Sequence, residues 1–144
     1  MVDDNCLFCR IVSGDLPATV VYEDEHSIAF LDHRPLFPGH TLLVPREHVE
    51  TLGDLSRPLV GPFFETAQLL SRAVESALVA EGTFVAMNNR VSQSVPHLHV
   101  HIVPRRRKDG LKGFFWPRTK YKDDEEMKVV KAKIAAAVKK IAVQ

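Results

Sequence analysis

The sequence predicts an α+β fold with a mostly antiparallel sheet. Five segments have the composition of β-strands, and only two long segments have helical periodicity. Strands that follow one another directly are usually antiparallel neighbours, because a parallel pair needs a long crossover connection. A chain of 144 residues is long enough for one domain with a buried core.

The first three strands are expected in the N-terminal third of the chain. Residues 20–23 and 27–31 are rich in strand-forming side chains, and the polar break between them predicts a hairpin. Residues 35–39 contain two prolines and a glycine, which is the composition of a turn. A third strand follows over residues 40–45 and ends at a proline.

A helix is expected over residues 58–80, with Pro58 in its first turn and Gly82 just beyond its end. Its apolar residues recur at helical spacing: Phe63, Ala67, Leu70, Val74, Ala77 and Leu78. Residues 83–87 read as the fourth strand. A C-terminal helix over about 123–142 begins with acidic residues and ends with lysines, which complements the helix dipole.

Composition points to a soluble protein of ordinary kind. The net charge is +1, and 45% of the residues are hydrophobic. No apolar run approaches the roughly 20 residues that span a bilayer, and the N-terminus lacks a signal-peptide pattern. We expect a cytoplasmic protein with neither membrane nor nucleic-acid partners. The basic run at residues 105–108 is either a solvated loop or an attractor for an anionic substrate.

Three histidines, His97, His99 and His101, occupy alternate positions in what reads as the fifth strand. Alternate side chains of a strand point to the same face, so the three imidazoles would line one surface. The residues between and after them would face the core: Leu98, Val100 and Ile102. Such a row is not needed to fold a strand, since Thr or Ser would serve without titrating near neutral pH. The pattern therefore predicts a functional site.

Cys6 and Cys9 are the only two cysteines and form a Cys-x-x-Cys motif. In a cytoplasmic protein such a pair is more often metal-binding or redox-active than a structural disulfide. A thioredoxin-like site would follow a buried strand, and no strand is expected before Cys6. Metal binding is therefore favoured.

These motifs together resemble the histidine-triad (HIT) family of nucleotide hydrolases and transferases, and in particular its bacterial Hint-type branch. The family hallmark is His-x-His-x-His followed by two apolar residues, here residues 97–103. Other segments that look like bacterial Hint-type members are residues 6–14, 21–25, 29–32, 38–42, 44–48 and 113–118. The resemblance runs from about residue 5 to about residue 118.

The resemblance implies a five-stranded antiparallel sheet with flanking helices, in a single HIT domain over residues 1–144. It also implies a homodimer whose sheets join across a two-fold axis, with one nucleotide site in each protomer. Trp116 would lie near the partner subunit's site, or belong to the core or the surface.

The resemblance also assigns catalytic roles. His99 would attack the α-phosphate and form a phosphohistidine that water then cleaves, because a neutral imidazole is a good nucleophile toward phosphorus. Its far ring nitrogen would donate to a backbone carbonyl. His101 would donate to phosphate oxygens, and Ser94 matches a hydroxyl that contacts the phosphate or the leaving group.

The resemblance to the HIT family also implies which residues bind the substrate. Asp32 matches the acid that binds the ribose hydroxyls, and one of Asn88 and Asn89 matches a loop asparagine near the phosphate. Gln93 matches a phosphate contact of the Fhit branch. Ser94, Gln93 and Asp32 could instead be turn residues that satisfy loop backbone. The base would be held by apolar packing. The candidates are Phe8, Ile11, Phe30 and Leu31, and each of them could instead belong to the core.

The loop between the asparagines and the triad departs from the family pattern. It is shorter than usual, and residues 90–92 replace a glycine-rich stretch, which could bring Arg90 to the substrate. His33 stands where an apolar residue is common and could lie beside the ribose or face solvent. His26 and His40 have no evident partner, and we expect them in a surface turn and in strand packing, respectively.

The same resemblance implies structural zinc. Some Hint-type members and related uridylyltransferases add two histidines to the cysteine pair, and these correspond to His48 and His97 here. A closed Cys2His2 set leaves no position for water, so the zinc would be structural. The alternative is two free thiols, with His97 bonded to backbone.

The leading functional expectation is an adenosine phosphoramidase-like hydrolase that releases a nucleoside monophosphate from an AMP-like purine substrate. A Fhit-type dinucleoside polyphosphate hydrolase is the second, supported by Gln93 and by the basic run. A nucleotide-binding scaffold with little turnover, or a pure metal-binding module, would be a different class of protein.

Overall fold

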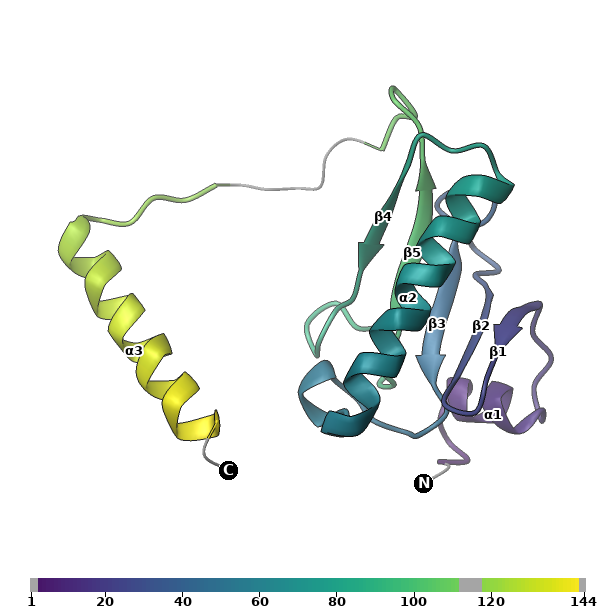
Figure 1. The fold of residues 1–144 in the computed structure, drawn as a ribbon, viewed down its shortest axis with the longest axis horizontal. Coiled ribbons are helices and arrows are strands. Elements are labelled where there is room, and N and C mark those ends of the chain that lie inside the picture. The colour runs from purple at the N-terminus through teal and green to yellow at the C-terminus, as the bar shows by residue number, and fades with distance from the viewer. Residues whose placement is uncertain (1–2, 112–117, 143–144) are drawn as a thin grey trace. The chain divides into compact units, whose positions relative to one another are not determined.

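The computed structural model describes residues 3–111 and 118–142. The chain divides into two compact units, Met1–Asp109 and Gly110–Gln144. The first unit contains the sheet and both candidate sites, and the second contains one long helix (Figure 1). None of the described helices is long and apolar enough to cross a membrane.

The first unit is built on a five-stranded antiparallel sheet with the strand order β1-β2-β3-β5-β4. The strands are β1 (Val20–Glu23), β2 (Ser27–Leu31), β3 (Thr41–Pro45), β4 (Gly82–Ala86) and β5 (Val100–Arg105). The predicted α+β class and antiparallel sheet are therefore confirmed. Each of the first four strands lies within one residue of its predicted range at either end.

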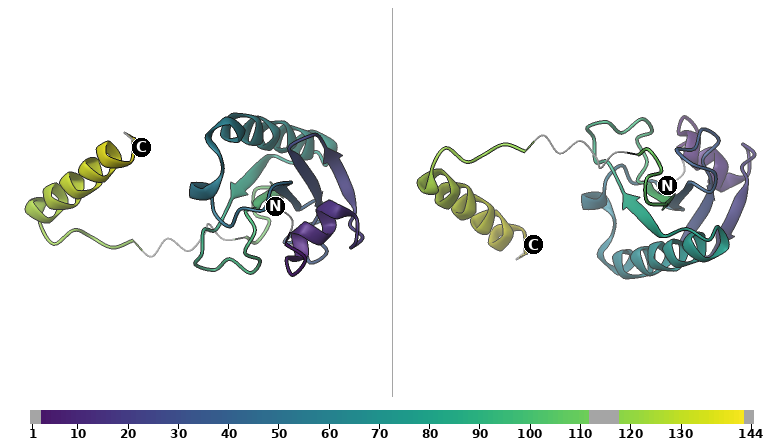
Figure 2. Two further views of the ribbon diagram at one scale, coloured as in Figure 1. Left: turned by 90° about the horizontal axis from the view of Figure 1, so that it is seen from below. Right: turned by 90° about the horizontal axis from the view of Figure 1, so that it is seen from above.

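Two helices lie on opposite faces of this sheet, as the two views of Figure 2 show. The helix α2 (Arg57–Ala77) covers one face, and its predicted stripe packs there. The short helix α1 (Leu7–Ser13) covers the other face. A 3-10 turn, η1 (Leu52–Asp54), precedes α2.

The helix α1 was not among the predicted elements. Sγ of Cys6 accepts the N–H of Cys9 at 3.5 Å, so Cys6 caps the N-terminus of the helix. Gly14 ends it with a φ of 85°, a left-handed conformation that glycine adopts without strain. Phe8 and Cys9 are its buried residues, so this one short helix brings the cysteine pair and an aromatic ring onto the sheet.

The two cores follow the alternation of the strands. In β3, Leu43 belongs to the core under α2, while Leu42 and Val44 belong to the core under α1. In β5, Val100 and Ile102 face α2. His101 therefore points to the α1 face, as the alternation of the histidines predicts.

Only the last of the three histidines lies within a strand, because β5 begins at Val100. The register pairs Val100 with Leu43, so continuing the ladder would place Leu98 opposite Pro45, which has no N–H to donate. The carbonyl of Pro45 lies 2.9 Å from Nε2 of His97, and the N–H of Leu98 bonds to the carbonyl of Val49 at 2.7 Å, so the ladder does not continue. The expectation of a strand that carries all three histidines was wrong in this detail.

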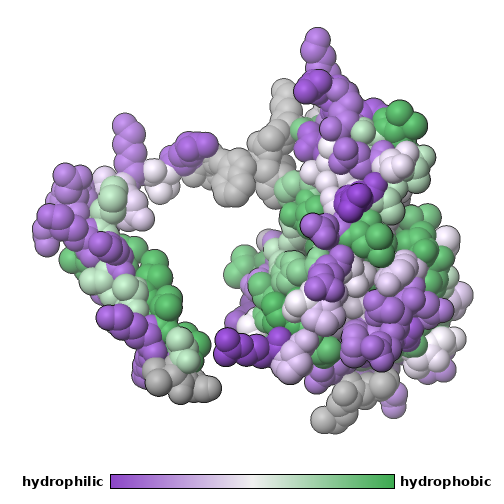
Figure 3. Space-filling model, viewed as in Figure 1, coloured by the Kyte–Doolittle hydropathy of each residue, from purple (hydrophilic) through white to green (hydrophobic). Residues whose placement is uncertain are grey.

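The second unit contains α3 (Asp124–Ala142), close to the predicted range of 123–142. Acidic residues occupy its first turn, and Lys139 and Lys140 its last. Apolar side chains gather along one side of the helix (Figure 3), and its exposed large apolar residues are Met127, Val129, Ile134, Val138 and Ile141. Trp116 and most of the segment 113–118 lie outside the described residues.

Candidate active site and metal centre

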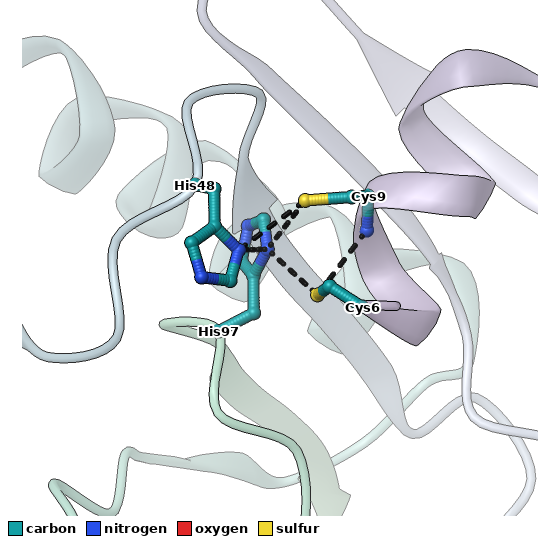
Figure 4. Close-up of side chains that lie close together, drawn as sticks. All are labelled: Cys6, Cys9, His48 and His97. Carbon is teal, nitrogen blue, oxygen red and sulfur yellow. Dashed lines mark hydrogen bonds between the residues drawn. The ribbon is translucent and has the colours of Figure 1, made fainter. Parts of the chain in front are cut away.

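Cys6, Cys9, His48 and His97 converge on one point between α1 and the sheet, as Figure 4 shows. Nδ1 of His97 lies 3.4 Å from Sγ of Cys6, 3.6 Å from Sγ of Cys9 and 3.3 Å from Nδ1 of His48. Nδ1 of His48 lies 3.3 Å from Sγ of Cys9. The four atoms come from three separate parts of the chain.

The hydrogen of His97 cannot be on the nitrogen that faces this cluster. Nε2 of His97 lies 2.9 Å from the carbonyl oxygen of Pro45, and a carbonyl only accepts, so Nε2 carries the hydrogen. Burial lowers the pKa of His97 to about 4, which keeps the ring neutral at pH 7. Nδ1 of His97 therefore presents a lone pair to the two sulfur atoms and to His48.

This donor set fits a tetrahedral zinc ion. Zinc binds nitrogen at about 2.0–2.1 Å and sulfur at about 2.3 Å, which places neighbouring ligand atoms about 3.3–3.8 Å apart. The separations above, 3.3 to 3.6 Å, fall within that range. The Nε2–H of His97 on Pro45 is the outer hydrogen bond that zinc-binding histidines commonly make. Burial raises the pKa of the Cys9 thiol, and a bound cation would offset that effect by favouring the thiolate.

A cavity of about 520 Å³ opens beside this cluster, on the α1 side of the sheet. Its apolar lining comes from α1, from the segment that follows α1, and from β2, β3 and Val95. The polar residues that line it are Thr19, Asp32, His33, Ser94, His99 and His101. An apolar pocket with a few polar groups at one side is the usual form of a small-molecule site.

His99 is held by a hydrogen bond and by an aromatic contact. Its Nδ1 lies 2.7 Å from the carbonyl oxygen of His97, so Nδ1 carries the hydrogen and donates it. The rings of Phe8 and His99 pack in a T-shaped arrangement, with 5.1 Å between the ring centroids. The hydrogen bond expected for His99 is present, and it leaves Nε2 with a lone pair beside the cavity.

His101 lies next to His99, with 5.0 Å between the two ring centroids. Burial lowers the pKa of His101 to about 4, and the neighbouring rings of His99 and His40 act in the same direction. His101 is therefore neutral at pH 7. The cavity wall thus carries two adjacent imidazoles, those of His99 and His101.

The predicted sugar and base residues line the same cavity. Asp32 lies beyond the end of β2, and its carboxylate accepts the N–H of Arg34 at 2.9 Å. Phe8 and Phe30 are 5% and 4% exposed and pack edge to face at 5.5 Å, so each belongs to the core and lines the cavity at once. Leu31 is 37% exposed and stands at the mouth.

Of the phosphate contacts predicted in the loop before the triad, Ser94 lines the cavity, and the others do not. The side chain of Gln93 accepts the N–H of Arg90 at 2.8 Å and donates to the carbonyl of Glu50 at 2.6 Å. Asn88 donates to the carbonyl of Ser92, and Asn89 accepts the N–H of Leu52. All three amides therefore hold the shortened loop in place, and among the described residues none of them, nor Arg90, lines the cavity.

The basic run begins at the last residue of β5 and continues into the turn that follows, and each of its arginines has a local partner. Arg105 bonds to Asp109 at 2.6 and 3.0 Å, and Arg107 bonds to Glu81 at 3.0 and 3.2 Å. Arg106 donates to the carbonyl of Leu78. These contacts support the interpretation as a loop rather than as an attractor for substrate.

The family model of the HIT domain matches residues 13–108. The chain belongs to the HIT family. Among the relatives of this HIT protein, the adenosine 5′-monophosphoramidase of Schizosaccharomyces pombe is 34% identical over 137 residues, which is 94% of this chain and 99% of that protein. This similarity supports a hydrolase role at the family level.

Two solved structures resemble this HIT protein closely. A HIT family member from Bacillus subtilis superposes with a TM-score of 0.81 at 36% identity and covers 92% of this chain and 96% of that one. A zinc-bound histidine triad family protein from Mycobacterium smegmatis has a TM-score of 0.71 at 37% identity and covers 92% and 95%. The Cys2His2 cluster of this HIT protein is compatible with zinc.

Sequence reasoning missed several residues at the cavity. Leu7, Leu16 and Thr19 line it, and they flank or belong to the unpredicted helix α1 and the segment after it. His40, which we expected in strand packing, contacts His101 at 2.9 Å. The signal for His40 was its place in the Pro-Gly-His segment that resembles the family.

Proposed function

We propose that this protein hydrolyses nucleoside 5′-phosphoramidates, with AMP as the nucleotide part, through a phosphohistidine on His99. The observation that carries the proposal is the hydrogen bond from Nδ1 of His99 to the carbonyl of His97, at 2.7 Å. It leaves the lone pair of Nε2 free to attack phosphorus, and fixes the ring beside the cavity.

The reaction proceeds in two displacements. The Nε2 lone pair of His99 forms a bond to the α-phosphorus as the phosphorus–nitrogen bond of the substrate breaks, and the released amine takes that electron pair and a proton from solvent. Water then attacks the phosphorus and gives a proton back to solvent, and the bond to Nε2 breaks with its electron pair returning to the nitrogen, which gives AMP and restores the neutral imidazole. His101 and Ser94 donate to the phosphoryl oxygens or the leaving group.

The cavity supports an AMP-like substrate. Its apolar end, formed in part by Phe8, Ile11 and Phe30, suits packing against a purine ring. Asp32 lines the cavity close to His101 and can accept both ribose hydroxyls. The phosphoramidase named among the relatives acts on this substrate class. The polyphosphate alternative loses support, because Gln93 and the basic run have other partners.

The decisive experiment compares turnover of adenosine 5′-phosphoramidate by the native protein and by His99→Ala. We expect a rate loss of about 10³-fold or more, because the substitution removes the nucleophile. The affinity for AMP should change by only a few-fold, as measured by calorimetry. His26→Ala, which changes a partly exposed histidine outside the cavity lining, is the matched control and should keep the native rate. Equal rates for His99→Ala and native protein would refute the proposal.

We also propose that Cys6, Cys9, His48 and His97 hold a structural zinc ion. Four protein ligands leave no open position for water or substrate, so the ion would tie α1 to the sheet rather than take part in the reaction. The separations of the donor atoms support this proposal.

Metal analysis of the purified protein tests the zinc site. We expect one zinc per native chain and per His26→Ala chain, little zinc in Cys6→Ala, and a free energy of unfolding lower by several kcal/mol in that variant. Full zinc content in Cys6→Ala, or none in native protein prepared with zinc, would contradict the site.

The remaining proposal concerns assembly. The strand order leaves β1 and β4 as the edges of the sheet, and an edge strand can pair with its copy in a second chain. We propose a homodimer with one complete site in each chain. Sedimentation analysis should give twice the chain mass, and a monomer at micromolar concentration would argue against it.

A further inference from the structure

His33 stands at the mouth of the cavity, next to Asp32. It follows the end of β2, is exposed, and lines the cavity together with its neighbour. Among the described residues, its side chain has no hydrogen-bond or ion-pair partner. The imidazole of His33 is therefore available to a molecule that enters the cavity.

The bend after β2 brings both of these side chains to the cavity. Neighbouring side chains of a strand point to opposite faces of the sheet, so a continued strand would separate Asp32 from His33. The strand instead ends at Leu31, and Oδ1 of Asp32 accepts the N–H of Arg34 at 2.9 Å, a turn that aspartate commonly makes. The alternation is lost at this bend, and residues 31–33 all line the cavity.

The register of the sheet orders the cavity from its apolar end to the histidines. Phe30 pairs with Leu42, and Leu42 pairs with His101, so one row of side chains crosses β2, β3 and β5 on the α1 face. A nucleotide with its base at Phe30 and its phosphate at His101 would place its ribose over Leu42. A carboxylate oxygen of Asp32 lies within 4.8 Å of a ring nitrogen of His101, which puts the carboxylate beside that ribose.

A bound ribose needs hydrogen-bond donors as well as acceptors. Each hydroxyl has one hydrogen and two lone pairs, and a carboxylate only accepts, so Asp32 can take the hydrogens but cannot serve the oxygens. A ligand that fills the cavity also displaces water that would otherwise donate. The hydroxyl oxygens therefore need a donor from the protein.

Two of the described lining residues can supply that donor, Thr19 and His33. The other polar lining residues are Asp32 itself and the three that the proposed function places at the phosphate, Ser94, His99 and His101. The carbonyl of Thr19 accepts the N–H of Leu31 at 2.9 Å, which puts Thr19 on the β1 side of β2, away from β5. His33 directly follows Asp32 in the chain and is therefore the donor closer to the ribose hydroxyls.

We propose that His33 is a specificity-determining residue, whose ring N–H donates to a ribose hydroxyl oxygen while Asp32 accepts the hydroxyl hydrogen. An imidazole carries at least one N–H whether it is neutral or protonated, so the donor is always present. The inference rests on the proposed AMP-like substrate. It predicts a preference for ribonucleotides, because a site built to bond a hydroxyl rejects an analogue that leaves its polar groups unpaired.

Calorimetry of the full chain with AMP, 2′-deoxy-AMP and 3′-deoxy-AMP tests this role. We expect His33→Leu to weaken AMP binding about 5-fold to 10-fold, and to bind the deoxynucleotide that lacks the accepting hydroxyl within about twofold of native affinity. His33→Gln retains an N–H donor and should recover most of the loss. His26→Ala, outside the cavity lining, should match native protein for all three nucleotides.

Two results would overturn the proposal. The first is a native affinity of His33→Leu for AMP, or an equal loss for AMP and both deoxynucleotides, since the ring would then donate nothing to the sugar. The second is a ribonucleotide preference that is lost in Thr19→Val and kept in His33→Leu, which would assign the donor to Thr19. Because His33 is exposed and has no partner among the described residues, its replacement should leave the Tm unchanged.

A failure of the proposed function remains distinguishable from a failure of this inference, because calorimetry measures binding without turnover. If His99→Ala kept the native rate while His33→Leu lost the ribonucleotide preference, only the catalytic assignment would be wrong. If His99→Ala were inactive and His33→Leu kept the preference, only the role of His33 would be wrong. If native protein bound no AMP, both the substrate class and this inference would be wrong.

Discussion

At the residue scale, the three triad histidines differ in the ring nitrogen that carries hydrogen. His97 carries it on Nε2 and presents Nδ1 to the cysteines, and His99 carries it on Nδ1 and presents Nε2 to the cavity. His101 carries it on Nε2, because Nδ1 of His40 accepts the N–H of Leu36 and the Nε2–H of His40 then faces Nδ1 of His101. In the proposed function, this one residue type provides a metal ligand, a nucleophile and a hydrogen-bond donor. Backbone carbonyls set the tautomers of His97 and His99, and the His40 ring sets that of His101.

Burial of these neutral rings predicts that the protein loses stability in mild acid. Burial lowers the pKa of His101 to about 4, and it lowers the pKa of His40 as well. In the unfolded chain they return to about 6.5, so the unfolded state binds more protons between about pH 6.5 and about pH 4. The stabilisation is therefore complete above that window and is lost as the pH falls through it.

Urea unfolding at about pH 7, 6 and 5 measures this effect. The free energy of unfolding should decrease with each step, by up to about 1.4 kcal/mol per pH unit for each proton taken up. His101→Asn should make the decrease shallower, and His26→Ala should leave it unchanged. A free energy of unfolding that is constant from pH 7 to pH 5 would show that the rings are not buried as neutral groups.

Single residues also show where sequence reasoning reached its limit. The spacing of His97, His99 and His101 and the Cys-x-x-Cys pair were visible locally, and both lie at the candidate sites. The partners of Gln93 and Asn89 are backbone groups of Glu50 and Leu52, 43 and 37 residues away. No local pattern reveals such contacts, so the alternative of loop support could not be decided from the sequence.

At the scale of elements, composition predicted the strands and the long helices, and it failed for α1. The helix α1 has only seven residues, and its N-cap is a cysteine rather than a usual capping residue. Its sequence was interpreted for its metal ligands, which it positions, and not for helical periodicity. The late start of β5, at Val100, could not be predicted from composition either. Pro45 lacks the N–H that would continue the ladder, but its place opposite Leu98 is known only once the register is known.

The end of α2 contains a strained residue and a testable stability change. The N–H of Ala80 bonds to the carbonyl of Glu75 at 3.0 Å, and the N–H of Val79 lies 3.4 Å from the carbonyl of Ser76. In this arrangement at a helix C-terminus, the position of Val79 is usually occupied by glycine. Val79 occupies that position with a φ of 52° and is 83% exposed. A β-branched residue is disfavoured there.

Val79→Gly should therefore stabilise the protein. Relief of the backbone strain outweighs the larger entropy of the unfolded glycine chain, for a net gain of about 0.5–1 kcal/mol and a rise in Tm of roughly 3 °C. Thermal unfolding measures it, with Val85→Gly, in the middle of β4, as a control that should destabilise. A lower Tm for Val79→Gly would mean that the valine makes contacts that its exposure does not suggest.

At the scale of the whole molecule, the sheet separates two buried cores, one on each of its faces. The α2 side holds a hydrophobic core, and the α1 side holds the cysteines, His97 and the cavity. The class of the fold followed from the elements. The place of β5 between β3 and β4 did not, because strand order depends on long-range pairing that composition does not encode.

The central claim is that Nε2 of His99 forms the covalent intermediate, and rapid-quench mass spectrometry tests it most directly. Native protein is mixed with adenosine 5′-phosphoramidate, quenched within milliseconds at alkaline pH, digested and mapped. The account predicts an adenylyl group on the peptide that contains His99, absent from His99→Ala and transient in native protein. An adenylyl group on another residue, or turnover without any covalent adduct, would contradict it.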